Sequence, residues 1–191
     1  MSSLQLQGPP ALVKKAMLLV ETHQFKQSSI MEVGRLLSVL AAQVQDGLLG
    51  EIGSGCGFGT AWLVSGMSAF ARLITVEIDE VRAAAVRSLF QGDSRVEVVT
   101  GDWRQLRHTK KLDLLFADGG IDAQNSERLI EWLSIGGLLV KDDLTPEEYW
   151  PDDWRGKKDP VREFWMTNPR LRATEVRVAD RHAVILAARI G

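Results

Sequence analysis

The sequence has little of several features that would point to other classes of protein. Cys56 is its one cysteine, so neither an internal disulfide nor a cysteine-rich zinc site can form, and a reducing cytoplasm is expected. No run reaches the roughly 18 to 20 apolar residues of a membrane span, and the polar residues 1–10 predict no signal peptide. The formal net charge is only −2, which disfavours binding to nucleic-acid phosphates. These absences predict a cytoplasmic protein without membrane or nucleic-acid partners.

The composition is that of a globular protein with a substantial core. Of the 191 residues, 45% are hydrophobic and 25% are charged, which suits one domain of ordinary size. Neither an internal repeat nor a linker interrupts the chain. We therefore expect a single domain over residues 1–191, with N-terminal helices in residues 1–46 and an α/β core in residues 47–191.

The hydrophobic pattern changes period along the chain. Apolar residues recur at helical spacing over 11–22 and 30–45, where Ser28 or Ser29 could cap the second helix. Short apolar runs then alternate with helical patterns, which predicts βαβ units and a parallel sheet. The expected parallel strands are 47–52, 73–78, 96–100, 112–117 and 138–141, with helices at 60–67, 80–90, 124–133 and 161–167. Residues 172–178 and 182–188 predict a C-terminal antiparallel hairpin, which gives seven strands in all.

A glycine-rich turn follows the first strand, in the run "EIGSGCGFG" at residues 51–59. Its glycines allow a tight turn and a close approach to a ligand, and the next helix begins directly after it. The glycines do not fit the Gly-x-Gly-x-x-Gly spacing of dinucleotide-binding proteins, and no Gly-Lys-Ser/Thr follows, so neither NAD nor a Walker phosphate loop is favoured.

The next two strands end in side chains that suit an adenosine. Glu77 ends the second strand, where a carboxylate can accept hydrogen bonds from both ribose hydroxyls. Asp102 and Trp103 follow the third strand, where they can accept from an adenine amino group and pack beside the ring. Each residue alone is more typical of a solvated strand end or a core position. Their joint order along one βαβ series favours an adenosine without a pyrophosphate.

These motifs resemble class I S-adenosylmethionine-dependent methyltransferases, and more narrowly the cation-dependent O-methyltransferases of the catechol and caffeoyl-CoA type. The resemblance covers residues 28–191 and rests on the runs "LLGEIGSGCGFGTAWLV", "ITVEID", "DLLFADGG", "GGLLVKDDL" and the C-terminal helix and hairpin. It implies a Rossmann-like sheet and S-adenosylmethionine as cofactor. The reaction expected from it is O-methylation of a small, catechol-like acceptor.

The resemblance also implies roles for particular residues. Glu51, Gly53, Gly55 and Gly59 would hold the methionine part of the cofactor, with Gly59 standing where the family has Ser or Thr. The ribose would lie on Glu77, and the adenine beside Asp102 and Trp103. Ser29 and Asp118 would also contact the cofactor.

Three carboxylates are expected at two adjacent strand ends. Asp118 ends the fourth strand, and Asp142 and Asp143 end the fifth, so their charges repel one another unless a cation lies between them. Oxygen ligands suit Mg²⁺, or Ca²⁺ and Mn²⁺. In the family, Asp, Asp and Asn at these positions hold a cation that chelates a vicinal diol, which makes Asp118 and Asp142 the expected catalytic residues. Alternatively, Asp142 and Asp143 cap a loop, and Asp118 contacts only the cofactor.

Other positions depart from the family pattern or leave alternatives open. Ile121 stands where the family's Asp-x-x-Lys motif has a lysine that can act as general base. The aromatic segment 145–160 is either a lid over a flat acceptor or a surface plug. His23, His108 and His182 show no ligand spacing and are interpreted as structural.

Two other functions remain open at this stage. One is a module that binds S-adenosylmethionine without transferring its methyl group, as the missing lysine would allow. The other is a different transferase on the same fold, such as an aminopropyltransferase. In either case the partner is a small molecule, and the N-terminal helices are expected to cover the cofactor edge and to offer a surface for a homodimer.

Overall fold

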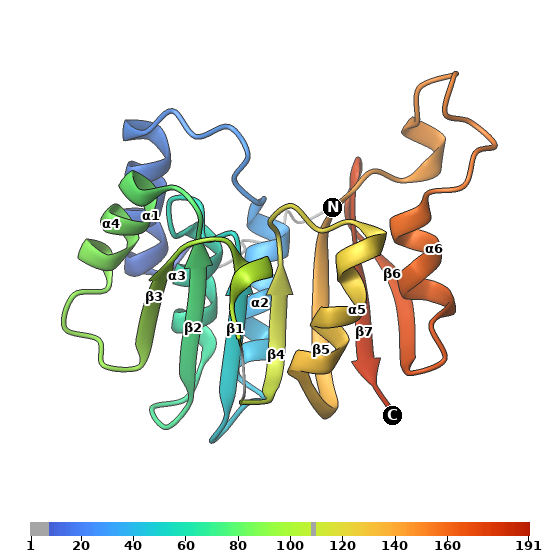
Figure 1. The fold of residues 1–191 in the computed structure, drawn as a ribbon. Helices are drawn as coiled ribbons and strands as arrows, with labels where there is room; N and C mark the ends of the chain where they lie inside the picture. The colour runs from blue at the N-terminus through green and yellow to red at the C-terminus, as the bar shows by residue number, and fades with distance from the viewer. Residues whose placement is uncertain (1–7, 108–109) are drawn as a thin grey trace, which may run out of the picture.

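The computed structural model describes residues 8–107 and 110–191, and one twisted sheet of seven strands forms its centre (Figure 1). The spatial order is β3-β2-β1-β4-β5-β7-β6. Strands β1 to β5 pair in parallel, whereas β7 is antiparallel to both β5 and β6. Their bounds are β1 Leu48–Ile52, β2 Arg72–Glu77, β3 Val96–Thr100, β4 Leu112–Ala117, β5 Leu133–Leu144, β6 Leu171–Ala179 and β7 His182–Arg189. The predicted Rossmann-like sheet with a C-terminal hairpin is confirmed.

Helices cover both faces of this sheet. Along β4, Leu114 and Phe116 belong to one buried cluster and Leu115 and Ala117 to another, because successive side chains of a strand point to opposite faces. Burial on both faces explains why the parallel strands read as continuous apolar runs. Helices α1 Ala11–Thr22, α2 Met31–Ala41, α3 Phe58–Gly66 and α4 Glu80–Leu89 contribute to the first cluster. Helices α5 Ala123–Trp132 and α6 Pro160–Thr167 contribute to the second cluster. The structure also has two short 3-10 helices, η1 Trp103–Gln105 and η2 Glu147–Tyr149.

The N-terminal helices pack onto α3. Val13 of α1 and Leu37 of α2 are fully buried in the same cluster as Trp62 of α3. Gly34 permits this approach, because a Cβ atom there would lie 2.2 Å from the Trp62 ring. Helix α2 is shorter than predicted, and the expected serine cap is wrong: its N-cap is Ile30, without a side-chain hydrogen bond. The hydroxyl of Ser29 is used elsewhere.

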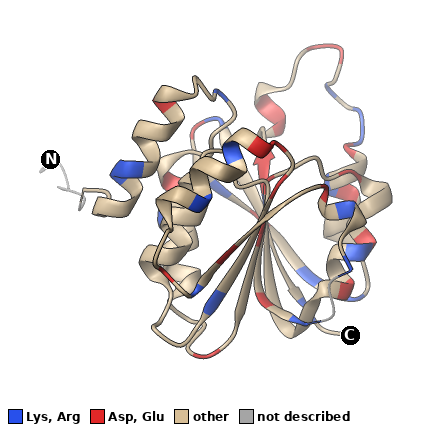
Figure 2. Ribbon diagram, turned by 60° about the vertical axis from the view of Figure 1, so that its left-hand side comes forward, with Lys and Arg blue, Asp and Glu red and all other residues tan. Residues whose placement is uncertain are grey.

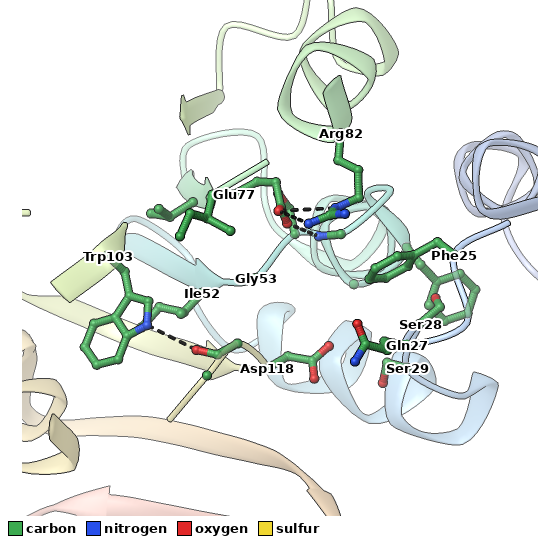
Figure 3. A pocket seen from close by; sticks show the side chains of 18 of the residues that line it. Phe25, Gln27, Ser28, Ser29, Ile52, Gly53, Glu77, Arg82, Trp103 and Asp118 are labelled. Atoms are coloured by element: carbon green, nitrogen blue, oxygen red, sulfur yellow. Dashed lines mark hydrogen bonds and ion pairs between the residues drawn. The ribbon is translucent and has the colours of Figure 1, made fainter. Parts of the chain in front are cut away.

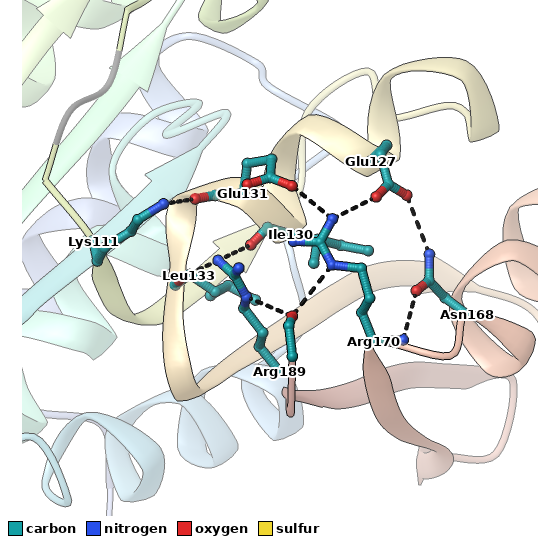
Figure 4. A network of polar contacts seen from close by, with 9 residues as sticks. Lys111, Glu127, Ile130, Glu131, Leu133, Asn168, Arg170 and Arg189 are labelled. Atoms are coloured by element: carbon teal, nitrogen blue, oxygen red, sulfur yellow. Dashed lines mark hydrogen bonds and ion pairs between the residues drawn. The ribbon is translucent and has the colours of Figure 1, made fainter.

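A polar network fixes α5 against the C-terminal hairpin (Figure 4). Arg170, just before β6, donates to Glu127 Oε1 at 2.7 Å and to Glu131 Oε1 at 2.6 Å. Arg189, at the end of β7, donates to the carbonyl oxygens of Ile130 at 3.1 Å and Leu133 at 2.8 Å. These contacts hold the last two strands in register beside β5.

Basic and acidic residues are interspersed along the same elements (Figure 2). Among the described residues, no helix has both the length and the apolar character needed to cross a bilayer.

Candidate functional site

A cavity of about 280 Å³ opens where β1, β2 and β4 end (Figure 3). This is the edge of an open parallel sheet at which ligands bind. All the predicted cofactor residues except Glu51 lie on its wall: Ser29, Gly53, Gly55, Gly59, Glu77, Asp102, Trp103 and Asp118. The loop between α1 and α2 closes one side with Phe25, Gln27 and Ser28.

The glycine turn places its backbone against neighbouring strands. Gly53 has a φ of +85°, and a Cβ atom there would lie 2.9 Å from the carbonyl oxygen of Asp118. The Gly53 N–H donates to the carbonyl oxygen of Val76 at 2.9 Å, which ties the turn to β2. Glycine is therefore required at position 53 both by its left-handed backbone and by the close approach of β4.

Glu77 is the central acid of this cavity, and its carboxylate is already hydrogen-bonded. Its Oε2 accepts from the Gly55 N–H at 2.8 Å, and its Oε1 accepts from the Asp79 N–H at 2.9 Å. The Arg82 guanidinium also donates to Oε1, at 2.7 Å from its terminal nitrogen, and lies over the Phe25 ring. Since Oε1 already has these donors, Oε2 is the oxygen with more capacity for a further one.

Glu51 lies behind the cavity wall rather than on it. Its Oε2 accepts from the hydroxyls of Thr60 and Thr75, each at 2.5 Å, and its Oε1 is buried without a hydrogen-bond partner among the described residues. Burial raises the pKa of Glu51 to about 7, against the lowering effect of the two threonine hydrogen bonds. A Cβ atom at Gly59 would lie 2.5 Å from Glu51 Oε1. Glycine at position 59 thus leaves room for Glu51, which reaches the cavity only past that residue.

Asp102 and Trp103, which follow β3, form another part of the wall of this cavity. Asp102 caps η1 and accepts from Arg104 Nε at 2.8 Å, which lowers the pKa of its carboxyl. Trp103 is buried, packs edge-on against Trp132 and donates from Nε1 to the carbonyl oxygen of Gly119 at 3.1 Å. Its ring is therefore held rigidly beside the space available to a ligand.

Asp118 follows β4 and points into the cavity toward Gln27 and Ser29 (Figure 3). Burial raises the pKa of Asp118 well above its usual range, and the nearby carboxylates of Asp142 and Asp143 raise it further. The structure thus brings the three predicted acids into one electrostatic neighbourhood.

A β-bulge shapes the pair Asp142 and Asp143. In the pairing of β5 with β7, Lys141 faces Ile185 but Leu144 faces Ala183, so β5 has one extra residue here. Asp143 also has a φ of +64°, a left-handed backbone that Asp tolerates better than most residues. Without these two distortions, consecutive side chains would point to opposite faces of the sheet. The bulge therefore brings the two adjacent acids to one side.

His182 is the residue of this site that the sequence did not reveal. Its Nε2 lies 2.6 Å from Asp142 Oδ1, while the Ser29 hydroxyl donates to Asp142 Oδ2 at 2.5 Å. Burial raises the pKa of Asp142, but hydrogen bonds from His182, Ser29 and the Asp143 N–H together bring it below its ordinary value. His182 lies far from Asp142 in the sequence, but the two meet in space because the antiparallel β7 begins beside the end of β5. His108 lies outside the described residues.

A second, more open cavity of about 460 Å³ lies beyond Asp143. Trp150 is buried, and its Nε1 donates to the carbonyl oxygen of Thr145 at 2.8 Å, so this ring acts as a plug. Trp154 contacts Trp150 edge-on but is 46% exposed. Arg181 lies over the Tyr149 ring on the same wall. Asp143 lines both cavities and is the residue they share.

Comparison with known proteins shows a likeness to methyltransferases. Residues 51–144 match the model of a methyltransferase domain family. Catechol O-methyltransferase from Mycobacterium tuberculosis is 33% identical over an aligned length of 121 residues, with 58% of this chain and 54% of that protein covered. The chain spans about half the length of the curated relatives it matches.

Solved structures agree on the fold. The O-methyltransferase from Bacillus cereus in complex with S-adenosylhomocysteine is 21% identical, with a TM-score of 0.77 over 98% of this chain and 94% of that chain. Cofactor-bound Rv0187 from MTB is 23% identical, with a TM-score of 0.80 over 97% of this chain and 92% of that chain. These structures show that the chain has the Rossmann-like fold. Its central part, residues 51–144, is similar to a methyltransferase domain, and the curated relatives it matches are named as O-methyltransferases.

Proposed function

We propose that the first cavity binds S-adenosylmethionine and that the protein transfers the cofactor's methyl group to a hydroxyl oxygen of a small acceptor. The observation that carries this proposal is the joint placement of the glycine turn and Glu77 at the ends of β1 and β2. Ser54 supports it, because its hydroxyl is buried on the cavity wall without a partner in the described structure and can hydrogen-bond a ligand.

Three parts of the cavity wall would hold the three parts of the cofactor. The ribose hydroxyls would donate to Glu77, chiefly to Oε2, and the adenine would lie against Trp103 with Asp102 beside it. The methionine part would lie along Gly53 and Gly59 toward Ser29 and Asp118. Glu51, behind Gly59, would act on that end through its charge. When bound, the cofactor supplies an electrophilic methyl group on its sulfur.

The second cavity is the proposed acceptor site. It shares Asp143 with the cofactor cavity, so an acceptor there would present its hydroxyl to the cofactor across that residue. The exposed face of Trp154 offers a flat apolar surface that suits an aromatic, catechol-like ring. The curated relative named a catechol O-methyltransferase is consistent with such an acceptor.

Asp118, Asp142 and Asp143 are the residues proposed to hold a divalent cation. These residues fit a cation, because Asp142 and Asp143 repel the charge of Asp118 and raise its pKa. A positive ion between the three carboxylates would relieve this repulsion. A cation there would neutralise the acids and lower the pKa of a coordinated hydroxyl. Lys141 does not replace the missing family lysine, since its buried Nζ donates to the carbonyl oxygen of Asp142.

Calorimetry followed by an acceptor screen tests this function. The folded protein should bind S-adenosylhomocysteine, and catechols should be methylated in the presence of Mg²⁺ or Mn²⁺. Binding without turnover on any acceptor would favour a module that only holds the cofactor. Turnover with the decarboxylated cofactor and a polyamine would favour an aminopropyltransferase.

A further inference from the structure

The start of β7 adds a nitrogen donor to the acidic end of β5. One ligand atom from each of Asp142, Asp143 and His182 can be chosen so that all three lie within 4.8 Å of one another. Among the described residues, this mixed group meets that test, and a trio containing Asp118 does not. The cluster is therefore not made of carboxylates alone.

The backbone builds this cluster in two independent ways. The bulge in β5 and the left-handed Asp143 bring two consecutive acids together, and the antiparallel pairing of β5 with β7 brings His182 beside them. The Ser29 hydroxyl, which donates to Asp142 Oδ2 at 2.5 Å, holds this carboxylate from the side opposite His182. Ligating carboxylates are commonly oriented by such outer hydrogen bonds.

We propose that His182 is a ligand of the divalent cation together with Asp142 and Asp143, and that the ion is a first-row transition metal such as Mn²⁺ or Co²⁺. The proposal rests on the cation site of the proposed function and specifies it further. His182 would exchange its contact with Asp142 Oδ1 for one with the ion. A site with both nitrogen and oxygen ligands binds first-row ions with affinity that rises from Mn²⁺ to Co²⁺, whereas Mg²⁺ prefers oxygen ligands throughout. In this arrangement Asp118 is not one of the three ligands; it would contribute its negative charge from the first cavity.

Pulsed electron paramagnetic resonance on the Mn²⁺-loaded full chain tests the ligand directly. The wild-type protein should show coupling between Mn²⁺ and a ¹⁴N nucleus, and His182→Gln should lose it. His23→Gln is the matched control, since His23 is exposed at the end of α1 and should leave the coupling intact. Bound Mn²⁺ without nitrogen coupling in the wild type, or coupling that persists in His182→Gln, would overturn the proposal.

Calorimetry with the metals alone gives a second measurement that does not depend on activity. The wild type should bind Mn²⁺ at least about tenfold more tightly than Mg²⁺, and His182→Gln should lose most of that difference. Equal affinities for the two ions in the wild type would contradict the nitrogen ligand, as would a protein that binds no Mn²⁺.

The two proposals fail separately. Methyl transfer that proceeds with Mg²⁺, in a protein whose bound Mn²⁺ shows no nitrogen coupling, would overturn the role of His182 and leave the proposed function intact. Nitrogen coupling in a protein that methylates no acceptor would support His182 and refute the function.

Discussion

Arg82 and Glu77 form an ion pair on the wall of the first cavity, with a terminal guanidinium nitrogen 2.7 Å from Glu77 Oε1. Arg82 also lies over the ring of Phe25, which belongs to the loop between α1 and α2. One arginine therefore links the proposed ribose acceptor to the segment that closes the cavity. The carboxylate is held in place before any ligand arrives.

Replacing Glu77 should weaken cofactor binding strongly. Glu77→Ala should raise the calorimetric Kd for S-adenosylhomocysteine more than about tenfold, or roughly 1.4 kcal/mol, because the ribose hydroxyls lose a charged acceptor. Glu80→Gln is the matched control, since Glu80 is exposed on α4 and does not line the cavity. Unchanged affinity in Glu77→Ala would exclude the ribose role.

Glu51 should make stability depend on pH. Its pKa is raised from 4.5 to about 7 in the folded protein, so between these values the folded state retains a proton that the unfolded state has lost. The free energy of unfolding should therefore fall as pH rises through this window, by on the order of 3 kcal/mol. Urea denaturation of Glu51→Gln at several pH values should show a flatter slope than the wild type.

The control for this experiment is Glu97→Gln, which changes an exposed acid on β3. It should keep the wild-type slope. If Glu51→Gln and the wild type lose stability equally as pH rises, the burial of Glu51 is not the cause.

The N-terminal helices should be necessary for the site. A chain that begins at Ala42 loses the buried side chains of α1 and α2, exposes Trp62 and removes Phe25 and Ser29 from the cavity wall. We expect poor solubility and loss of cofactor affinity, measured by size-exclusion chromatography and calorimetry. A chain that begins at Pro9 is the control. Its light-scattering mass also tests the predicted homodimer. Full solubility and affinity in the shorter chain would contradict a role for these helices.

Trp154 should affect the acceptor and not the cofactor. Trp154→Ala removes the exposed ring of the second cavity, so the KM for a catechol should rise by about threefold to tenfold while the Kd for S-adenosylhomocysteine stays the same. Phe70→Ala removes a more exposed ring, 76% against 46%, near the start of β2 and should change neither value. An unchanged KM in Trp154→Ala would mean that the acceptor binds elsewhere.

Asp142 should be needed for turnover more than for cofactor binding. It lies outside the cavity wall, yet it contacts His182 and Ser29 within the proposed cation site. EDTA should stop methyl transfer and a divalent cation should restore it, while Asp142→Ala should lower kcat severely and leave cofactor affinity largely intact. Activity that survives thorough removal of metal would refute the cation and make Asp142 a residue that shapes the loop.

The sheet and the glycine turn could be predicted because each depends on local pattern. Buried parallel strands give apolar runs; Glu77 is the last residue of β2, and Trp103 comes three residues after the end of β3. The position of Glu51 could also have been predicted. It lies two residues after Leu49 in β1, so the side chains of both residues point to the face of the sheet covered by α3.

The cluster around Asp142 could not be predicted in this way. Its assembly depends on the register of β7 against β5 and on a single inserted residue, neither of which is marked by a local sequence signal. His182 could have been suspected only by placing the start of an antiparallel β7 beside the end of β5. The pattern predicts a helix from residue 30, which Ser29 could cap. The helix α2 begins at Met31 instead, so the Ser29 hydroxyl is available to donate to Asp142.

The most direct test of methyl transfer is to incubate the full chain with S-adenosylmethionine carrying an isotope-labelled methyl group, a panel of catechols, and Mn²⁺ or Mg²⁺. Mass spectrometry should find the labelled methyl on a catechol oxygen, together with an equal amount of S-adenosylhomocysteine, and Glu77→Ala should reduce both products in parallel. A protein that binds the cofactor but leaves the label on its sulfur with every acceptor would contradict the proposed O-methyltransferase activity.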